Sequence, residues 1–323
     1  MALFEALIGS EMKKVEATLV EGFSDSALEA HVNSLCLSII NAGGKRMRPA
    51  LVLLASHLLP SYTDEEETAV CKLAAGVELL HTATLIHDDV IDNSLMRRGR
   101  PTLNSTSGNH VAVLAGDYMF TRCFATIKDL KKADVLSIIS DTLATLVTGE
   151  LDQLKNEGDV NISVEDYYTT IYCKTGALFE LSASAPAVYL GEEEKYITAL
   201  KNYGRYLGNA FQIIDDCLDY SSDSKTLGKN AGEDLQDKRI TLPVIFALQR
   251  CSEAEKEILI KAIENADLET VISYINKYDT LKECKNAAEQ SGEQAVKELN
   301  VFPENEYKQA LISLVERALN RKN

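Results

Sequence analysis

Six charged residues with the chemistry to bind a metal–anion complex lie close together in LIHDDVIDNSLMRRGRPT, residues 85–102. Three aspartates and three arginines fall within residues 88–100, directly after an apolar run. A second group, in QIIDDCLD (residues 212–219), repeats the D-D-x-x-D pattern. Mg²⁺ prefers carboxylate oxygens, and guanidinium groups bind phosphate oxygens. Both signs side by side therefore predict a site for a phosphate-bearing anion held through metal ions.

The spacing within each aspartate group is the spacing of one helix face. Residues four apart in an α-helix lie on nearly the same side, about 6 Å apart along the axis. Asp88 therefore shares a face with Asp92, and Asp215 shares one with Asp219. Carboxylates at the end of a buried helix are costly unless cations neutralise them. A solvated charged helix end is the alternative for one such motif, but two copies behind apolar turns favour metal binding.

Long helices are needed to position these motifs, and the sequence predicts an all-α fold. Only six prolines occur in 323 residues, and apolar residues recur at helical spacing nearly throughout. No β-hairpin or alternating strand pattern stands out. We expect about a dozen helices in one domain over residues 1–323. The stretch SSDSKTLGKNAGEDLQDKRITLP is the one long loop that we expect, which makes it a candidate functional segment.

Composition excludes several classes of protein. Acids outnumber bases 49 to 33, for a net charge of −16, which argues against nucleic-acid binding. The seven cysteines occur singly, so we expect free thiols in a reducing compartment and no zinc site. The N-terminus has no signal-peptide layout, and apolar runs such as PALVLLASHLLP are too short to cross a bilayer. We expect a soluble cytoplasmic protein.

The order of the motifs along the chain carries a family resemblance. GGKRMRP, HTATLIHDDVID, RRGRPT, GDYMFTR, YCKTGALFE, FQIIDDCLD and LGKNAGEDLQDKRITLP together resemble the trans-isoprenyl diphosphate synthases over nearly the whole chain. The resemblance implies a single-domain, isoprenoid-synthase-type helical bundle around a central cavity. It also implies a homodimer that requires Mg²⁺, with two or three ions per site.

The resemblance assigns roles to individual residues. The implied metal ligands are Asp88, Asp92 and Asp215, and the supporting acids are Asp89, Asp216 and Asp219. The implied residues at the allylic diphosphate are the cations Arg97, Lys174, Lys229 and Lys238, with Thr175 and Gln212. The implied residues at isopentenyl diphosphate, which the family holds without metal, are Lys45, Arg48, His81 and Arg98. Helix geometry also places His81, about two turns before Asp88, on the same face. A histidine satisfied within an apolar core is the alternative.

The implied chemistry is repeated condensation of isopentenyl diphosphate with an allylic diphosphate, farnesyl diphosphate being the expected primer. Likeness is greatest to the bacterial enzymes that make octaprenyl diphosphate for the quinone side chain, with seven or nine isoprene units left open. On geometry Thr84, one turn before Asp88, points toward the site, whereas Ala83 lies about 140° away. In the family the position of Ala83 gates product length. Both residues are small, which predicts a long product.

Three other kinds of protein share some of these features. A terpene cyclase would not need the GGKRMRP segment or the second D-D-x-x-D motif. A non-catalytic subunit of a two-component synthase tends to lose acidic motifs, and both are intact here. A metal-buffering or structural helical protein is the remaining alternative. Because the expected polyprenyl product is strongly apolar, we expect at most peripheral contact with a membrane during its release.

Overall fold

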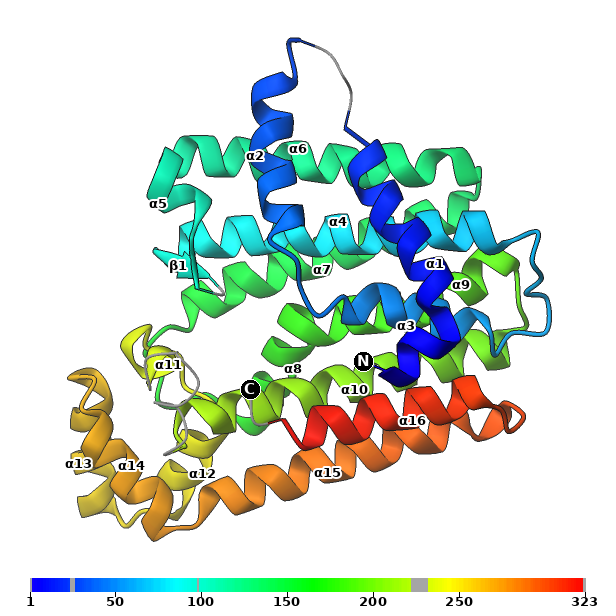
Figure 1. The fold of residues 1–323 in the computed structure, drawn as a ribbon. Helices are drawn as coiled ribbons and strands as arrows, with labels where there is room; N and C mark the ends of the chain where they lie inside the picture. The colour runs from blue at the N-terminus through cyan, green and yellow to red at the C-terminus, as the bar shows by residue number, and fades with distance from the viewer. Residues whose placement is uncertain (1, 24–26, 98, 222–231, 322–323) are drawn as a thin grey trace. The chain divides into compact units, whose positions relative to one another are not determined.

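The all-α prediction is confirmed in the computed structural model, which describes residues 2–23, 27–97, 99–221 and 232–321 (Figure 1). These residues form sixteen α-helices, more than the dozen expected. Two of them, α5 (Leu103–Ser107) and α11 (Glu233–Gln236), have only five and four residues. Two others, α13 (Glu253–Glu264) and α14 (Leu268–Lys277), are separated by only three residues.

The chain divides into two compact units, which are described separately. Unit 1 comprises residues 1–140, 181–200 and 301–311, and unit 2 comprises residues 141–180, 201–300 and 312–323. A single domain over residues 1–323 stays a prediction.

Unit 1 is built around one central helix. Its elements are α1 (Ala2–Glu21), α2 (Ala30–Asn41), α3 (Met47–Ser56), α4 (Glu67–Ile91), β1 (Met96–Arg97), β2 (Arg100–Pro101), α5 (Leu103–Ser107), α6 (Asn109–Ile127) and the 3₁₀ turn η1 (Lys128–Leu130). The central helix α4 packs against α1, α3 and α6, and Figure 1 shows it running beside α6. It is long and apolar enough to cross a membrane, contrary to our expectation for the apolar runs, but 72% of its most apolar window is buried inside the structure. We therefore interpret α4 as a core helix.

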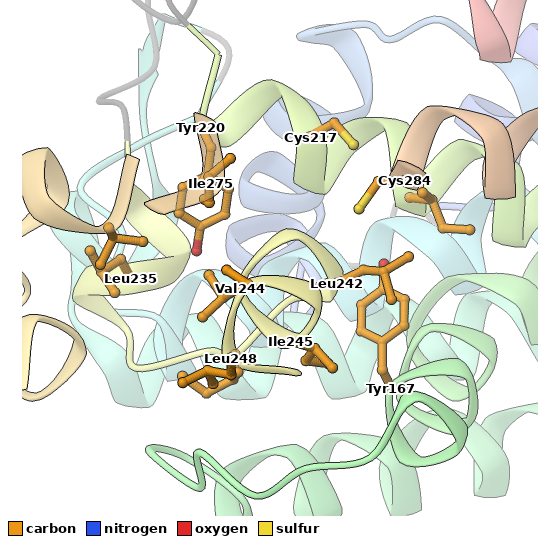
Figure 2. Packing of buried hydrophobic residues seen from close by; sticks show 14 of the residues in the cluster. Tyr167, Cys217, Tyr220, Leu235, Leu242, Val244, Ile245, Leu248, Ile275 and Cys284 are labelled. Carbon is orange, nitrogen blue, oxygen red and sulfur yellow. The ribbon is translucent and has the colours of Figure 1, made fainter. Parts of the chain in front are cut away.

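Unit 2 has a separate apolar core. Its own elements are α8 (Val164–Ile171), the π-helical turn η2 (Tyr172–Gly176), α11 (Glu233–Gln236), α12 (Leu242–Arg250), α13, α14 and α15 (Thr280–Glu298). Elements with residues in both units are α7 (Ala133–Lys155), α9 (Ala177–Leu190), α10 (Glu194–Asp219), the 3₁₀ turn η4 (Leu299–Val301) and α16 (Glu306–Leu319). Figure 2 shows side chains of α12, such as Leu242 and Val244, packed among Tyr167, Tyr220 and Ile275.

A small β-ribbon corrects the expectation that the chain has no hairpin. Strands β1 and β2 pair antiparallel, with Met96 opposite Pro101 and Arg97 opposite Arg100. Two residues per strand are too few to produce an alternating pattern in the sequence. The ribbon turns through Gly99, whose φ of +74° suits glycine.

Candidate functional site

The first aspartate motif lies at the C-terminal end of α4, in unit 1. Asp88 and Asp89 belong to its last turns and Asp92 is its C-cap residue. Asp88 and Asp92 are half-buried, whereas Asp89 is buried. Arg97 Nε donates to Asp89 Oδ1 at 2.6 Å. Burial raises the pKa of Asp89, and the charge of Arg97 opposes that rise.

The segment that carries the arginines is tied back to the end of α4. The Asn104 side-chain amide donates to the carbonyl oxygens of Asp89 and Ser94, each at 3.0 Å. Thr102 Oγ1 donates to the same Ser94 carbonyl at 2.7 Å and also caps α5. These bonds hold the β1–β2 hairpin, and with it Arg97, next to the first aspartate motif. Arg98, predicted for the isopentenyl diphosphate site, lies outside the described residues.

The basic GGKRMRP segment contacts α4 at His81, about two turns before Asp88. Arg48, in the first turn of α3, has its Nη1 3.0 Å from Nε2 of His81. A guanidinium only donates hydrogen bonds, so this ring nitrogen accepts and the neutral ring carries its proton on Nδ1. Lys45 is exposed, in the segment just before α3. Arg48 and His81, predicted from the resemblance to act together, are thus in contact.

The two residues predicted to govern product length have different surroundings on α4. Ala83 is fully buried, at 0% exposure. Thr84 is half-buried, and its hydroxyl donates to the His81 carbonyl at 2.8 Å.

The second aspartate motif lies at the C-terminal end of α10, in unit 2, within a chain of hydrogen bonds. Tyr167 Oη donates to Asp216 Oδ2 at 2.6 Å, and Gln212 Nε2 donates to Asp216 Oδ1 at 2.8 Å. Thr175 Oγ1 in turn donates to Gln212 Oε1 at 2.7 Å. Burial and the nearby charge of Asp234 raise the pKa of Asp216, while the two donors lower it. Thr175 and Gln212, predicted together for the allylic diphosphate, and Asp216, predicted as a supporting acid, therefore form one network.

Asp219, at the end of the same helix, caps the next one. Its carboxylate accepts backbone N–H bonds from Gly232, Glu233 and Asp234 at 3.1–3.2 Å, which anchors the start of α11. Such bonds suit the supporting role predicted for Asp219. They also bring in Asp234, which sequence reasoning missed. Burial and the charge of Asp219 raise the pKa of Asp234 to about 7.

Asp215, the predicted metal ligand of this motif, has a basic neighbour from the end of the chain. Arg321 Nη1 lies 3.3 Å from Asp215 Oδ1, and the guanidinium lies over the Phe211 ring, 4.0 Å from its centroid. The Asp215 side chain is 31% exposed, so part of it faces solvent beside this ion pair.

Lys174 and Thr175 are held by an irregular turn. The π-helical turn η2 joins α8 to α9, and π-turns occur frequently at functional sites. The backbone of α10 at Gly208 packs directly against the backbone of η2 at Gly176. A Cβ built on Gly208 would lie only 2.7 Å from the Gly176 Cα. Lys174 Nζ donates to Gln153 Oε1 of α7 at 3.2 Å.

A pocket in unit 2 brings several of these side chains together. Its lining includes Lys174, Gln212, Asp216, Asp234 and Arg239. An acid network facing two cations has the composition needed to hold a metal-bound diphosphate.

Lys238 is not among the residues that line this pocket. It is exposed, has φ +55°, and its carbonyl accepts the Gly158 N–H at 2.9 Å. Its neighbour Arg239 lines the pocket instead and forms ion pairs with Asp234 at 3.7 Å and Asp237 at 3.3 Å. The only signal for Arg239 in the sequence was its place beside Lys238. Lys229 lies outside the described residues.

The acidic motifs suit a metal that the substrate helps to bind. Among the described residues, no group of three or more His, Cys, Asp or Glu side chains is placed to hold a metal ion. Mg²⁺ usually takes one or two carboxylates and fills its other positions with water and substrate phosphate. The half-buried Asp88 and Asp92 and the partly exposed Asp215 fit that requirement.

Comparison with known proteins agrees with the fold and the motifs. The profile of the family Polyprenyl synthetase matches residues 29–278. The chain is 38% identical over 322 residues to the octaprenyl diphosphate synthase of Haemophilus influenzae, covering 98% of this chain and 96% of that protein.

Two solved structures are similar over nearly their whole length. A decaprenyl diphosphate synthase from Rhodobacter capsulatus has a TM-score of 0.92 and 35% identity, covering 99% of this chain and 98% of that one. A Caulobacter crescentus polyprenyl synthase, complexed with calcium and isoprenyl diphosphate, has a TM-score of 0.90 and 34% identity, covering 100% and 98%. The chain belongs to the polyprenyl synthetase family and is a prenyltransferase.

Proposed function

We propose that this chain adds isopentenyl diphosphate units to farnesyl diphosphate and releases octaprenyl diphosphate. The observation that carries the proposal is the pairing of acids with phosphate-binding groups in each unit. Arg97 contacts Asp89 at the end of α4, and the pocket beside the second motif contains both Lys174 and Asp216. A diphosphate bound through metal ions requires both kinds of group.

Asp88, Asp92 and Asp215 are the proposed ligands of Mg²⁺, two or three ions per site. When bound, Mg²⁺ supplies Lewis-acid stabilisation of the charge on the departing diphosphate. Calcium in the Caulobacter crescentus relative supports a divalent cation in this family. Asp89, Asp216 and Asp219 are proposed to orient the ligands, because each is already bonded to protein donors.

The cations act on the allylic diphosphate. We assign this role to Lys174 and Arg239, which line the pocket in unit 2, and the resemblance adds Arg97, Lys229 and Lys238 as further candidates. Heterolysis of the allylic C–O bond leaves a carbocation and moves negative charge onto the diphosphate, which fixed cations in the site stabilise. Thr175 and Gln212 are proposed to line the same site. Gln212 donates to Asp216, and Thr175 donates to Gln212.

Isopentenyl diphosphate is proposed to bind Lys45, Arg48, His81 and Arg98. Its double bond attacks the allylic cation, a new C–C bond forms, and a proton leaves to the released diphosphate. No side-chain nucleophile is needed. The apolar residues that precede both acidic motifs would exclude water, which would otherwise capture the cation.

An assay of the purified chain alone tests the proposal. The chain is incubated with farnesyl diphosphate, labelled isopentenyl diphosphate and Mg²⁺, and product length is read by reversed-phase chromatography. Octaprenyl diphosphate is expected, and none when EDTA replaces Mg²⁺ or in Asp88→Asn and Asp215→Asn variants. Heptaprenyl or nonaprenyl product would correct the chain length only. Activity that requires a second protein would overturn the proposal in favour of a subunit role.

The same preparation tests the assembly and the location. We propose a homodimer in the cytoplasm, with at most peripheral membrane contact during product release. Light scattering would give the mass of the assembly, and flotation with vesicles of neutral phospholipid would detect membrane binding.

A further inference from the structure

Arg46 lies between two residues of the proposed isopentenyl diphosphate site, but its side chain is used differently. It is the N-cap of α3 and has φ +46° and ψ +37°. A left-handed conformation is strained for a residue other than glycine, so contacts elsewhere must stabilise it.

Those contacts come from the guanidinium group. Nε and Nη2 bind the Glu16 carboxylate at 2.7 and 3.2 Å, Nη1 donates to Glu78 Oε1 at 2.9 Å, and Nη2 donates to the Ile40 carbonyl at 2.9 Å. These bonds occupy all but one of the N–H groups that a guanidinium carries. The Arg46 side chain is only 12% exposed and that of Glu78 only 7%. Arg46 therefore joins α1, the end of α2 and α4.

The bond to Glu78 lies next to the contact between Arg48 and His81. Glu78 precedes His81 by three residues on α4, which places both on one face of the helix. Arg46 and Arg48 are likewise two residues apart in the basic segment. The segment is thus attached to α4 at two neighbouring points, Arg46 to Glu78 and Arg48 to His81.

We propose that Arg46 is a positioning residue, which through Glu78 fixes the basic segment on α4 so that Lys45 and Arg48 meet isopentenyl diphosphate. Arg46 does not itself bind the substrate, because four of its five N–H groups are occupied and its guanidinium lies between two carboxylates. This inference rests on the proposed function and adds a residue to the same site.

Two single variants and one matched control test the proposal. Arg46→Lys keeps the charge but loses the forked geometry, and Glu78→Gln removes the charge of the anchor. The control is Lys14→Gln, because Lys14 also joins α1 to α4, through Glu67 at 2.8 Å, but is 52% exposed. The readouts are the KM of each substrate, kcat, and the Kd of isopentenyl diphosphate measured calorimetrically without Mg²⁺.

For both anchor variants the KM and the Kd of isopentenyl diphosphate are expected to rise on the order of tenfold, as for loss of one charged hydrogen bond. The KM of farnesyl diphosphate should change less than about twofold, because the bonds of Arg46 involve none of the cations proposed for its site. Lys14→Gln should match the wild type. Unchanged values for isopentenyl diphosphate, or an equal rise for both substrates, would overturn the proposal.

A double variant keeps the test decisive if a single variant does not fold. Arg46→Gln combined with Glu78→Gln leaves no unpaired buried charge between the two. Because the attachment to α4 is lost, the Kd of isopentenyl diphosphate should again rise on the order of tenfold, and an unchanged Kd would overturn the proposal. Calorimetry separates the two hypotheses. A wild type that binds isopentenyl diphosphate but makes no polyprenyl product would contradict the proposed function and leave this inference testable by Kd. An active wild type with unaffected anchor variants would contradict this inference alone.

Discussion

Replacing Tyr167 with phenylalanine isolates the hydrogen bond that holds Asp216. The bond is 2.6 Å long, and donor and acceptor residues are 3% and 4% exposed. A hydrogen bond to a charged group contributes about 1.5–3 kcal/mol, and burial prevents water from replacing the lost donor. Since only an oxygen atom is removed, the aromatic packing with neighbouring side chains remains. We therefore expect Tyr167→Phe to lower the free energy of unfolding by about 1.5–3 kcal/mol.

Urea unfolding and steady-state kinetics measure the two consequences. The unfolding midpoint should fall at an unchanged slope. Because Asp216 is also held by Gln212, we expect kcat/KM for the allylic substrate to fall about tenfold rather than vanish.

Tyr168→Phe is the matched control, since it removes the same atom from the next residue. Tyr168 packs edge-on against Tyr167, with ring centroids 5.8 Å apart, and within the described ranges its hydroxyl makes no hydrogen bond. Its unfolding free energy should change by less than about 0.5 kcal/mol. If Tyr167→Phe and Tyr168→Phe proved equal in both assays, the reasoning about this network would be refuted.

Three further predictions concern product length, packing and acid stability. Ala83→Phe should shorten the prenyl product, which chromatography would show. It should also destabilise unit 1 by about 1–3 kcal/mol, because Ala83 is fully buried. An unchanged product length would contradict a role of Ala83 in setting that length. Gly208→Ala should displace η2 and lower kcat by more than about tenfold. Gly9→Ala on α1 is the control: its added Cβ would meet nothing closer than 3.7 Å, so kcat should stay unchanged. Lys277 lowers the pKa of Glu255 to about 2, so the stability that this carboxylate contributes is present above its ordinary pKa near 4.5 and is lost as pH falls toward 2. Acid unfolding of Glu255→Gln should therefore depend less on pH across that window, and an unaltered pH profile would contradict the assignment.

The helical framework was predictable because long helices repeat their apolar face many times. The D-D-x-x-D spacing likewise placed Asp88 and Asp215 at helix ends, as the structure shows. Contacts between segments that are far apart in the sequence produce no repeating pattern in it. Asp234 joins the second motif only because Asp219 caps α11, and Tyr167 only because its hydroxyl reaches Asp216, 49 residues further along the chain.

The π-turn at Lys174 and the buried role of Arg46 were also hidden. The sequence YCKTG is compatible with an ordinary α-helix, and the turn is found where Gly208 allows the α10 backbone to approach Gly176. Arg46 looks like any other basic residue of a loop, because neither Glu16 nor Glu78 is near it in the chain.

The arrangement of α4 has a consequence for how this chain tolerates insertions and deletions. One continuous helix carries Glu78, His81 and Asp88. Adding or removing a single residue between His81 and Asp88 would rotate everything beyond it by about 100° and shift it by about 1.5 Å. The aspartates would then leave the side of the helix that bears the histidine, although every functional side chain would still be present. Point substitutions should thus be tolerated between these positions more readily than any change in their number.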